Sequence, residues 1–559
     1  MNLDSLDIKG DISVVDSDLV KYSRDASIFE VKPDMIVYPK DTEDVKQLVK
    51  WVSEHKKENQ TLSLTARSAG TDMTGGSLNE SIILDFTKYF NHIHEINRTN
   101  RPDLLDNRSG LLVGYAVTEP GVYYRDFEKE TLAKGLLLPS YPASREICAM
   151  GGIVANNSGG EKSLSYGKTE RYVEELNVVL SDGNEYVLKA LTLEELEVKK
   201  SQHNFEGQMY RDMYSLIESN YDAIQKAKPN VSKNSAGYYL WNIFPDKKTF
   251  DLTKLFVGSQ GTLGLITNIK LGLIKPKKYS KLLVIFLKDL TPLGDLVNAV
   301  MKFKPESFES YDDQTLKLAL RFLPDLIKKM KGSALSLFFE FLPEATMIVT
   351  GGLPKLVLLA EFTGDEESHV DATLQSAQEV VEQKFDVKTH ITKDSEEAEK
   401  YWTIRRESFS LLRKHVGNEH TAPFVDDVIV HIDQLPTFLP KLNELVNQYK
   451  SLTYTIAGHA GDANFHVIPL MDFHSEENRL AIPELSEKVY DLVISLHGSI
   501  TAEHNDGLIR TPYLEKMYGR EICELFKKTK DIFDPLNIFN PGKKVNGDMQ
   551  FAMSHIIKE

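Results

Sequence analysis

Residues 150–160 read "MGGIVANNSGG", and this stretch decides the fold that we expect for the first half of the chain. Glycine loses more conformational freedom on folding than any other residue, so this density favours a loop that lies against a large polar ligand. Two further stretches rich in small residues, "RSAGTDMTGG" (67–76) and "GSQGTLGLIT" (258–267), follow the same pattern. Together the three stretches predict a site for an extended nucleotide, with three unrelated turns as the alternative.

The stretch 67–76 differs from the two common phosphate-binding motifs. No lysine follows its glycines as in G-x-x-x-x-G-K-[ST], and it is not a G-x-G-x-x-G run that opens a helix after a strand. Taken alone it also fits a wide turn. Its glycines would nevertheless let backbone N–H groups approach an anion closely.

Strands and helices alternate around these glycine stretches. Residues 34–39 and 81–86 are short apolar runs that predict strands. Residues 41–55 predict a helix, with Asp41 or Thr42 as its N-cap and apolar residues at helical spacing. Residues 173–189 predict two strands joined by an Asp-Gly turn.

The character of the chain changes near Pro276. Residues 280–313 and 354–391 each predict a β-α-β unit, and two such units indicate a second domain in which helices cover a sheet. Between them, residues 320–352 mix basic and bulky apolar side chains. We expect a helical insert there, with a patch that contacts a membrane or a partner as the alternative.

Composition excludes several classes of protein. The chain has 559 residues, too many for one hydrophobic core, and a net charge of −16, so it is a poor candidate for binding nucleic acid. Its two cysteines suit a reducing compartment. The first residues lack a secretory signal, and no apolar run is long enough to span a membrane. We expect a cytoplasmic protein, with peripheral contact to a membrane as an open alternative.

Two stretches in the second half gather histidines and acidic residues. "TIAGHAGDANFHVIPL" (455–470) holds His459 and His466, and "TAEHNDGL" (501–508) holds Glu503 and His504. Two histidines and one carboxylate form a ligand set that suits zinc, manganese or iron. Ordinary polar residues near turns are the alternative.

The motifs in their order resemble a known family. "ARSAGTDMTGGS", "MGGIVANNSGG" and "LFVGSQGTLGLIT" resemble the flavin-binding domain of the vanillyl-alcohol oxidase superfamily. "AGHAGDANFH", "TAEHNDG" and "IFDPLNIFNPGKKV" resemble its D-2-hydroxyacid dehydrogenase branch. The resemblance implies an α+β fold with a two-part FAD-binding domain of the vanillyl-alcohol oxidase type, a ferredoxin-like substrate (cap) domain, and a helical C-terminal segment that returns to the flavin.

This resemblance gives the expected division of the chain and its flavin contacts. The expected parts are an N-terminal extension (1–32), the FAD-binding domain (33–275), the cap with its metal site (276–510) and the C-terminal helical segment (511–559). FAD is expected to be noncovalent, because the loop 67–76 has no histidine or cysteine. Gln260 stands where the family usually has glutamate. The residues that match flavin-binding positions are Arg67, Ser68, Ala69, Gly70, Thr71, Asp72, Gly75, Pro139, Gly151, Gly152, Ala155, Asn156, Ser158, Gly159, Tyr166, Ile266 and Asn540.

The resemblance also assigns roles around the histidines. It implies that His459, His466 and Glu503 bind a divalent metal, zinc or manganese, and that His504 takes the substrate's hydroxyl proton. Arg405 matches the residue that binds the substrate carboxylate, although its neighbour Arg406 is an alternative and two solvated arginines are another.

The expected activity is oxidation of a D-2-hydroxy acid to the 2-oxo acid with hydride transfer to FAD. Val425 stands where relatives specific for 2-hydroxyglutarate have lysine, which favours D-lactate or another monocarboxylate. Asn505 and Asp506 also depart from the family's E-H-G-x-G. The alternatives are another alcohol with a structural histidine pair, a non-catalytic flavoprotein subunit, and a metal hydrolase. The electron acceptor is expected to be a quinone, an electron-transfer protein or oxygen, and the oligomeric state stays open.

Overall fold

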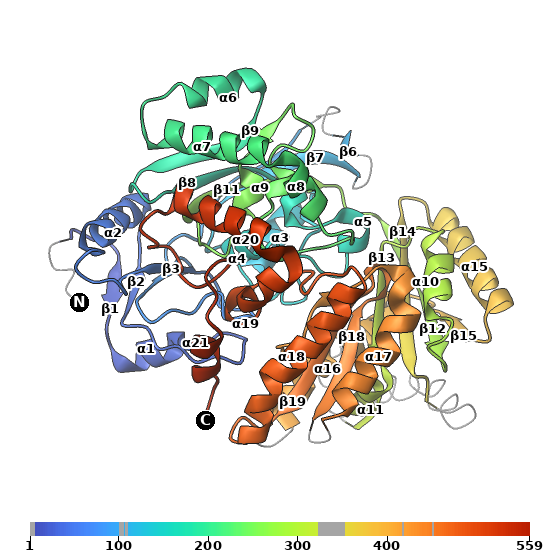
Figure 1. Cartoon of the computed structure of the whole chain (residues 1–559). Helices are drawn as coiled ribbons and strands as arrows, with labels where there is room; N and C mark the ends of the chain where they lie inside the picture. Colours follow the sequence, from blue (N-terminus) through green and yellow to red (C-terminus); the bar gives the residue numbers. More distant parts are fainter. Residues whose placement is uncertain are drawn as a thin grey trace.

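The computed structural model has the expected α+β fold, with two halves of mixed helix and sheet that meet along one interface (Figure 1). Its description covers residues 6–99, 105–106, 110–321, 353–415, 419–449 and 452–558. The expected insert 320–352 therefore lies almost entirely outside the described residues. No helix within the described ranges is long and apolar enough to cross a membrane.

The first sheet belongs to the half that contains the expected FAD-binding domain (33–275), which we call the flavin-binding half. Its strand order is β1-β2-β4-β3. Strands β2, β4 and β3 are parallel, as a β-α-β connection requires, and β1 joins antiparallel to β2. The side chain of Asp41 accepts hydrogen bonds from the backbone N–H groups of Glu43 and Asp44, which confirms it as the N-cap of α2. The elements are β1 (Asp11–Ser13), α1 (Asp16–Tyr22), β2 (Met35–Tyr38), α2 (Thr42–His55), β3 (Leu64–Arg67) and β4 (Ile82–Asp85).

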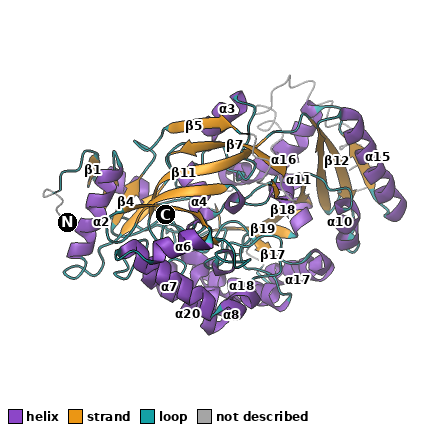
Figure 2. Cartoon of the chain, turned by 90° about the horizontal axis from the view of Figure 1, so that it is seen from above, coloured by secondary structure: helices purple, strands orange, loops and turns teal. Residues whose placement is uncertain are grey.

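The second sheet of this half is antiparallel, in the order β10-β9-β8-β11-β7-β5 with β6 paired to β7. Helices α7 and α8 pack with the C-terminal helix α20, so the end of the chain returns to this half (Figures 1 and 2). Its elements are β5 (Ile93–Arg98), β6 (Leu105–Asp106), β7 (Gly110–Thr118), α3 (Tyr124–Ala133), α4 (Met150–Asn156), α5 (Ser163–Tyr166), η1 (Thr169–Arg171), β8 (Val173–Val179), β9 (Glu185–Leu191), α6 (Leu193–Lys200), α7 (Phe205–Ser219), α8 (Tyr221–Ala227), η2 (Leu240–Asn242), β10 (Phe250–Asp251), α9 (Thr253–Phe256) and β11 (Leu265–Ile274).

The cap half is built on a third sheet, in the order β15-β12-β14-β13-β18-β19-β16, with β17 paired to β19. Its first four strands in sequence, with α10 and α15, have the ferredoxin-like arrangement that the two β-α-β units predicted. The elements are β12 (Tyr279–Leu287), α10 (Leu293–Met301), β13 (Ser307–Asp312), α11 (Asp313–Arg321), β14 (Leu356–Gly364), α15 (Glu367–Lys384), β15 (Lys388–Ile391), α16 (Ser395–His415), β16 (His420–Thr421), β17 (Val428–Ile429), η3 (Ile432–Gln434), α17 (Leu435–Asn447), β18 (Thr453–His459), η4 (Ala460–Asp462), β19 (Asn464–Met471) and α18 (Glu476–Ser495).

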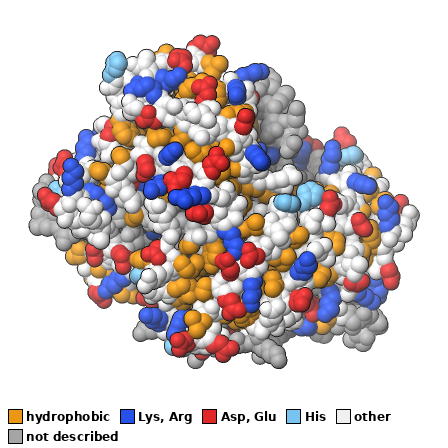
Figure 3. Space-filling view, in the orientation of Figure 1, with side chains coloured by type: hydrophobic (Ala, Val, Ile, Leu, Met, Phe, Trp, Pro, Cys, Tyr) orange, Lys and Arg blue, Asp and Glu red, His pale blue; other side chains and the backbone are white. Residues whose placement is uncertain are grey.

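The C-terminal residues return to the N-terminal segment, where the backbone N–H of Glu30 donates to the carbonyl of His555 and that of Ile557 to the carbonyl of Ile28. Phe29 forms an isolated antiparallel bridge with Ile556, and both side chains are buried in the same apolar core as the cap. On the face drawn in Figure 3, acidic and basic side chains are interspersed. The last elements are α19 (Gly507–Arg510), η5 (Thr511–Tyr513), α20 (Leu514–Phe533) and α21 (Met549–Ser554).

Candidate functional site

One cavity of about 1240 Å³ lies between the two halves. The stretches 67–72 and 151–160 line one wall, and His459, His466, Glu503 and His504 line another. The glycine stretches and the histidine motifs, which are separated by about 300 residues or more in the sequence, thus face a common space. A ligand held by the first wall would present one end to the second.

Most of the residues matched to flavin positions line this cavity. Those that line it are Arg67, Ser68, Ala69, Gly70, Thr71, Asp72, Gly151, Gly152, Ala155, Asn156, Ser158, Gly159 and Ile266. Gly75, Pro139, Tyr166 and Asn540 are not among its lining residues. Asn540 instead donates hydrogen bonds to the backbone carbonyls of Gly76 and Gln260. It therefore joins two of the glycine stretches without lining the cavity.

The first wall fits an FAD molecule. The cavity exceeds the volume of about 300–1,000 Å³ that is usual for a small-molecule pocket, as a dinucleotide together with a substrate requires. Gly152 belongs to α4, and a Cβ atom built on it would meet only Ser68, at 3.6 Å. A larger side chain there would extend into the cavity, which explains why a small residue suits this position. Gly70 adopts φ +65°, which favours glycine.

The second wall brings the expected metal ligands together. Nε2 of His459 lies 3.3 Å from Oε2 of Glu503. Two atoms that each lie about 2.1 Å from one ion have a similar separation. The ring of His466 is 5.3 Å from that of His459 and stacks on that of His504, with centroids 4.9 Å apart. All of these side chains are buried or half-buried, so the donor set fits a divalent ion.

Asp426 aligns two of these imidazoles. Its Oδ1 lies 2.9 Å from Nδ1 of His466, and its Oδ2 lies 2.6 Å from Nδ1 of His504. The Nε2 atoms of both rings therefore remain available for a ligand. Burial raises the pKa of Asp426, but the two histidines outweigh it and lower that pKa strongly. Burial lowers the pKa of His504, but Asp426 and Asp427 raise it to about 9.

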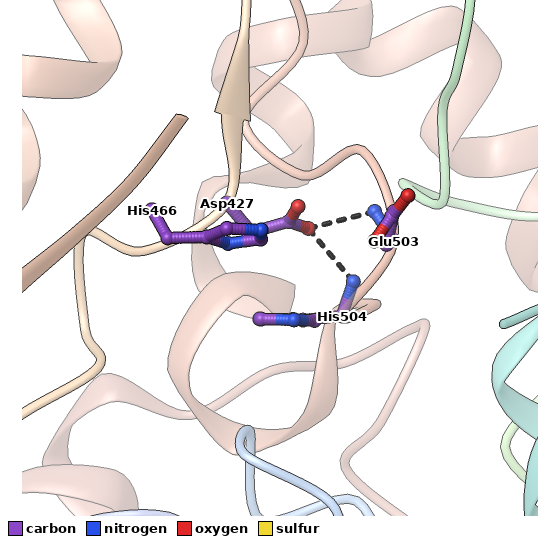
Figure 4. Close-up of side chains that lie close together, drawn as sticks. All are labelled: Asp427, His466, Glu503 and His504. Atoms are coloured by element: carbon purple, nitrogen blue, oxygen red, sulfur yellow. Dashed lines mark hydrogen bonds between the residues drawn. The ribbon is translucent and has the colours of Figure 1, made fainter. Parts of the chain in front are cut away.

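Asp427 holds the loop that carries Glu503 and His504 (Figure 4). Among the described residues, ligand atoms of Asp427, His466, Glu503 and His504 all lie within 4.8 Å of one another, a group that does not include His459. However, Oδ2 of Asp427 already accepts hydrogen bonds from Thr501 and from the backbone N–H groups of Glu503 and His504, each at 2.7 Å. We therefore assign Asp427 to supporting the loop, and His459 remains the better partner for Glu503.

A buried ion-pair chain extends from the histidines into the cap. Oε1 of Glu309, on β13, lies 2.7 Å from Nδ1 of His459, and its Oε2 lies 3.2 Å from Arg405. Burial lowers the pKa of His459, but Glu309 and Glu503 raise it to about 9. Arg405 itself lines the cavity, beside the candidate metal ligands. Arg406 also lines it, but it pairs with Glu161 at 3.0 Å and with Glu399 at 3.4 Å.

Sequence reasoning missed Glu309, Lys233 and Asp462 as parts of this site. Nζ of Lys233 lies 2.7 Å from Glu503 and 2.9 Å from Asp462. Neither Glu309 nor Lys233 lies near a histidine in the sequence, so no local pattern identifies them. Asp462 lies inside the motif 459–466, so its position beside the two histidines could have identified it from the sequence.

The departures from the family pattern connect the two walls. The side-chain amide of Asn505 donates to the backbone carbonyls of Asn156 and Gly258, at 3.2 and 3.0 Å. Gln260 accepts from the backbone N–H of Gly507 at 2.9 Å. Asp506 accepts from the backbone N–H of Gly237 and pairs with Lys544 at 2.9 Å. These polar contacts fasten the loop that carries Glu503 and His504 to the flavin-binding wall.

Comparisons with known proteins agree with this two-walled site. Residues 33–189 match the FAD binding domain, and residues 276–544 match the C-terminal domain of FAD linked oxidases. The D-2-hydroxyglutarate dehydrogenase of Pseudomonas putida is 27% identical over 96% of this chain and 50% of its own length. This chain thus spans about half the length of that relative.

Shorter relatives match over most of their length. The glycolate oxidase subunit GlcD of Bacillus subtilis is 26% identical, with 93% of this chain and 91% of that protein covered. A D-lactate dehydrogenase of Anaerostipes hadrus is 24% identical, with 92% and 90% covered. Among solved structures, p-cresol methylhydroxylase with substrate bound has the same fold, with a TM-score of 0.65, 17% identity, and 96% of this chain and 94% of that chain covered.

The fold and the cavity together define the class of protein, a flavoprotein with an FAD-binding domain and a substrate-binding cap. The two family models account for most of both halves, and the solved structures of the same fold are of the vanillyl-alcohol oxidase type. The chain therefore contains the FAD binding domain and the C-terminal domain of FAD linked oxidases, in the fold that the vanillyl-alcohol oxidase-type structures share.

Proposed function

We propose that this protein oxidises a D-2-hydroxy acid to the 2-oxo acid, with FAD as the hydride acceptor. One observation carries the proposal: the flavin-binding wall and the cluster of His459, His466, Glu503 and His504 line the same cavity. A hydroxy acid has a carboxylate, a hydroxyl proton and a Cα hydrogen that must each meet a different group. The cavity places a guanidinium, an imidazole and the flavin wall around one space.

The residues of this chain then have separate roles. Arg405 would bind the substrate carboxylate through its guanidinium. Asp426 engages Nδ1 of His504 and leaves Nε2 to take the hydroxyl proton. The positive charge of a bound ion would lower the pKa of His504 from about 9 and so favour the neutral imidazole that this role needs. His459, His466 and Glu503 would hold a divalent ion, zinc or manganese. When bound, FAD supplies a hydride acceptor, and the ion supplies a Lewis acid for the hydroxyl and carboxylate oxygens.

We favour a short monocarboxylate such as D-lactate as the substrate. Val425 is fully buried in the apolar core and does not line the cavity. In the described part of the cavity wall, Arg405 already pairs with Glu309, and Arg406 pairs with Glu161 and Glu399. A second carboxylate would have to compete with these pairs, whereas the methyl group of lactate would not.

D-2-Hydroxyglutarate is the second candidate. The similarity to D-2-hydroxyglutarate dehydrogenases over 96% of this chain favours it. Exchange of Glu161 or Glu399 for a substrate carboxylate at Arg406 would provide the recognition that this longer acid needs. Glycolate, the substrate named for the Bacillus subtilis relative, would need no distal contact.

Anaerobic mixing tests the proposal directly. The purified protein should show the flavin absorption band near 450 nm, and D-lactate should bleach that band while L-lactate leaves it unchanged. Glycolate and D-2-hydroxyglutarate, run beside them, rank the substrates by rate. Bleaching by D-2-hydroxyglutarate alone would reject D-lactate, and bleaching by none of the acids would reject the proposed activity.

The role of the metal needs its own measurement. If His459 and His466 were only structural, an alcohol of another class would be the substrate and a chelator would have no effect. We expect the purified protein to contain about one divalent ion per chain and to lose activity on dialysis against a chelator. Zinc or manganese should restore it. The electrons would then leave the flavin to a quinone, an electron-transfer protein or oxygen, which a panel of acceptors distinguishes.

A further inference from the structure

Lys233 is a buried lysine that joins the two walls of the cavity. It lies between α8 and η2 in the flavin-binding half, and its side chain is 3% exposed. Its ammonium reaches two segments of the opposite wall, Oε1 of Glu503 at 2.7 Å and Oδ2 of Asp462 at 2.9 Å. Both carboxylates are buried, so this ammonium is a counter-charge that water cannot replace.

The contact with Lys233 gives the two carboxylate oxygens of Glu503 different partners. Oε1 accepts the hydrogen bond from Lys233, while Oε2 faces Nε2 of His459 at 3.3 Å. The two ring nitrogens of His459 also have different roles. Glu309 engages Nδ1, so Nε2 is the nitrogen that can bind an ion. Each of these two side chains therefore has one atom held by the protein and one atom offered to the site.

We propose that Lys233 is a positioning residue that restricts Glu503 to a single metal-binding oxygen. A carboxylate can bind a cation through one oxygen or through both. If Glu503 used both, two imidazoles, two Glu503 oxygens and the two oxygens of a hydroxy acid would give zinc about six ligands, more than the four or five that it normally takes. Lys233 thus keeps a ligand position open for the substrate. The inference rests on the proposed function, because it concerns the same ion and the same substrate.

Substitution of Lys233 by methionine separates ion binding from substrate binding. Methionine has a similar length and no charge, so Lys233→Met releases Oε1 of Glu503. We expect the variant to retain cobalt(II), a spectroscopic substitute for zinc, as well as the unsubstituted protein does in equilibrium dialysis. Its affinity for oxalate, which binds a cation through two oxygens, should fall about tenfold in calorimetric titration of the cobalt-loaded, FAD-containing protein.

A matched variant shows whether the contact with Glu503, and not the loss of any buried lysine, is responsible. Lys530→Met removes a buried lysine that contacts Thr262, Asp534 and Phe539 outside the cavity wall. It should reduce thermal stability without changing oxalate affinity, which controls for the loss of any buried lysine.

The outcomes are distinguishable. Equal oxalate affinity in Lys233→Met and the unsubstituted protein, with cobalt bound to both, would overturn the inference while leaving the proposed function intact. Loss of cobalt together with oxalate binding in Lys233→Met would also overturn it, because Lys233 would then only support the site's structure. An equal loss of oxalate affinity in Lys530→Met would overturn it too. An unsubstituted protein that binds no cobalt would contradict the proposed metal site itself.

Discussion

The two walls of the cavity are built in opposite ways. The flavin-binding wall consists largely of backbone and small side chains from two continuous stretches, 67–72 and 151–160. The opposite wall carries charged and ionisable side chains from α16, the β18–β19 hairpin and the loop before α19. The first wall suits a large ligand that needs close approach and many backbone donors. The second suits a small reacting group that needs a few charges in fixed positions.

Among substitutions in the opposite wall, loss of His504 should have the largest effect on the rate of the reaction. His504→Ala removes the imidazole that we assign to proton removal, so flavin bleaching by the substrate should slow by about 10²–10⁴-fold. The flavin should stay bound, because His504 belongs to the opposite wall. Stopped-flow absorbance near 450 nm measures the rate, and the flavin-to-protein absorbance ratio measures retention.

A surface histidine provides the control for this experiment. His474 pairs with Asp472 and its side chain is 58% exposed, so His474→Ala should bleach at the normal rate. Bleaching at the normal rate in His504→Ala would remove His504 from the mechanism. Loss of flavin from His504→Ala would instead show that the two walls do not act separately.

A large side chain placed in the flavin-binding wall tests whether FAD binds there. Gly152→Leu should yield folded protein without flavin, because the new side chain would extend from α4 into the cavity with only Ser68 nearby. Gly152→Ala is the matched control, since its Cβ would lie at an ordinary contact distance of 3.6 Å from Ser68. The flavin content of the purified variants and their metal content measure the outcome. Normal flavin content in Gly152→Leu would place the cofactor elsewhere.

The orientation of the imidazoles should matter less than their presence. Asp426→Asn keeps the shape of the side chain but removes the charge that holds Nδ1 of both His466 and His504. We expect metal affinity to fall about 10–100-fold, as measured by competition with a chelator. Asp433→Asn is a suitable control, because Asp433 pairs with His431 on the surface. Unchanged affinity in Asp426→Asn would mean that packing alone orients the two rings.

The smallest effect on the reaction itself should come from the contacts that join the walls, because they act on stability. Asn505 is fully buried and has φ +74°, and its side chain donates two hydrogen bonds to the flavin-binding wall. Asn505→Ala should reduce the free energy of unfolding by about 2–4 kcal/mol, from the lost hydrogen bonds and the strained backbone. Asn505→Gly should cost about 1–2 kcal/mol, because glycine relieves the strain.

Denaturant unfolding of both Asn505 variants measures this difference. The same samples report flavin affinity, which should fall in both, because both lose the link to the carbonyls of Asn156 and Gly258. Equal stability of the two variants would show that the backbone conformation at position 505 carries no strain. Unchanged flavin affinity would show that the walls are joined by packing instead.

Much of the fold could be predicted because it depends on local patterns. The helix 41–55 and its N-cap Asp41, the turn between the strands of 173–189, and the two β-α-β units all formed as expected. Each depends on periodicity or on turn residues that are neighbours in the sequence. The placement of Asn540 could not be deduced in this way, because its partners are the carbonyls of Gly76 and Gln260, hundreds of residues away.

By itself the sequence determined the elements, the glycine-rich wall and the short spacing of His459 and His466, since backbone conformation is set largely by nearby residues. Only the tertiary structure decided which charges meet. Glu309 lies 150 residues before His459, and Lys233 lies 270 residues before Glu503. Such pairs form because a buried charge is stable only next to an opposite one, and the chain must fold before those neighbours exist.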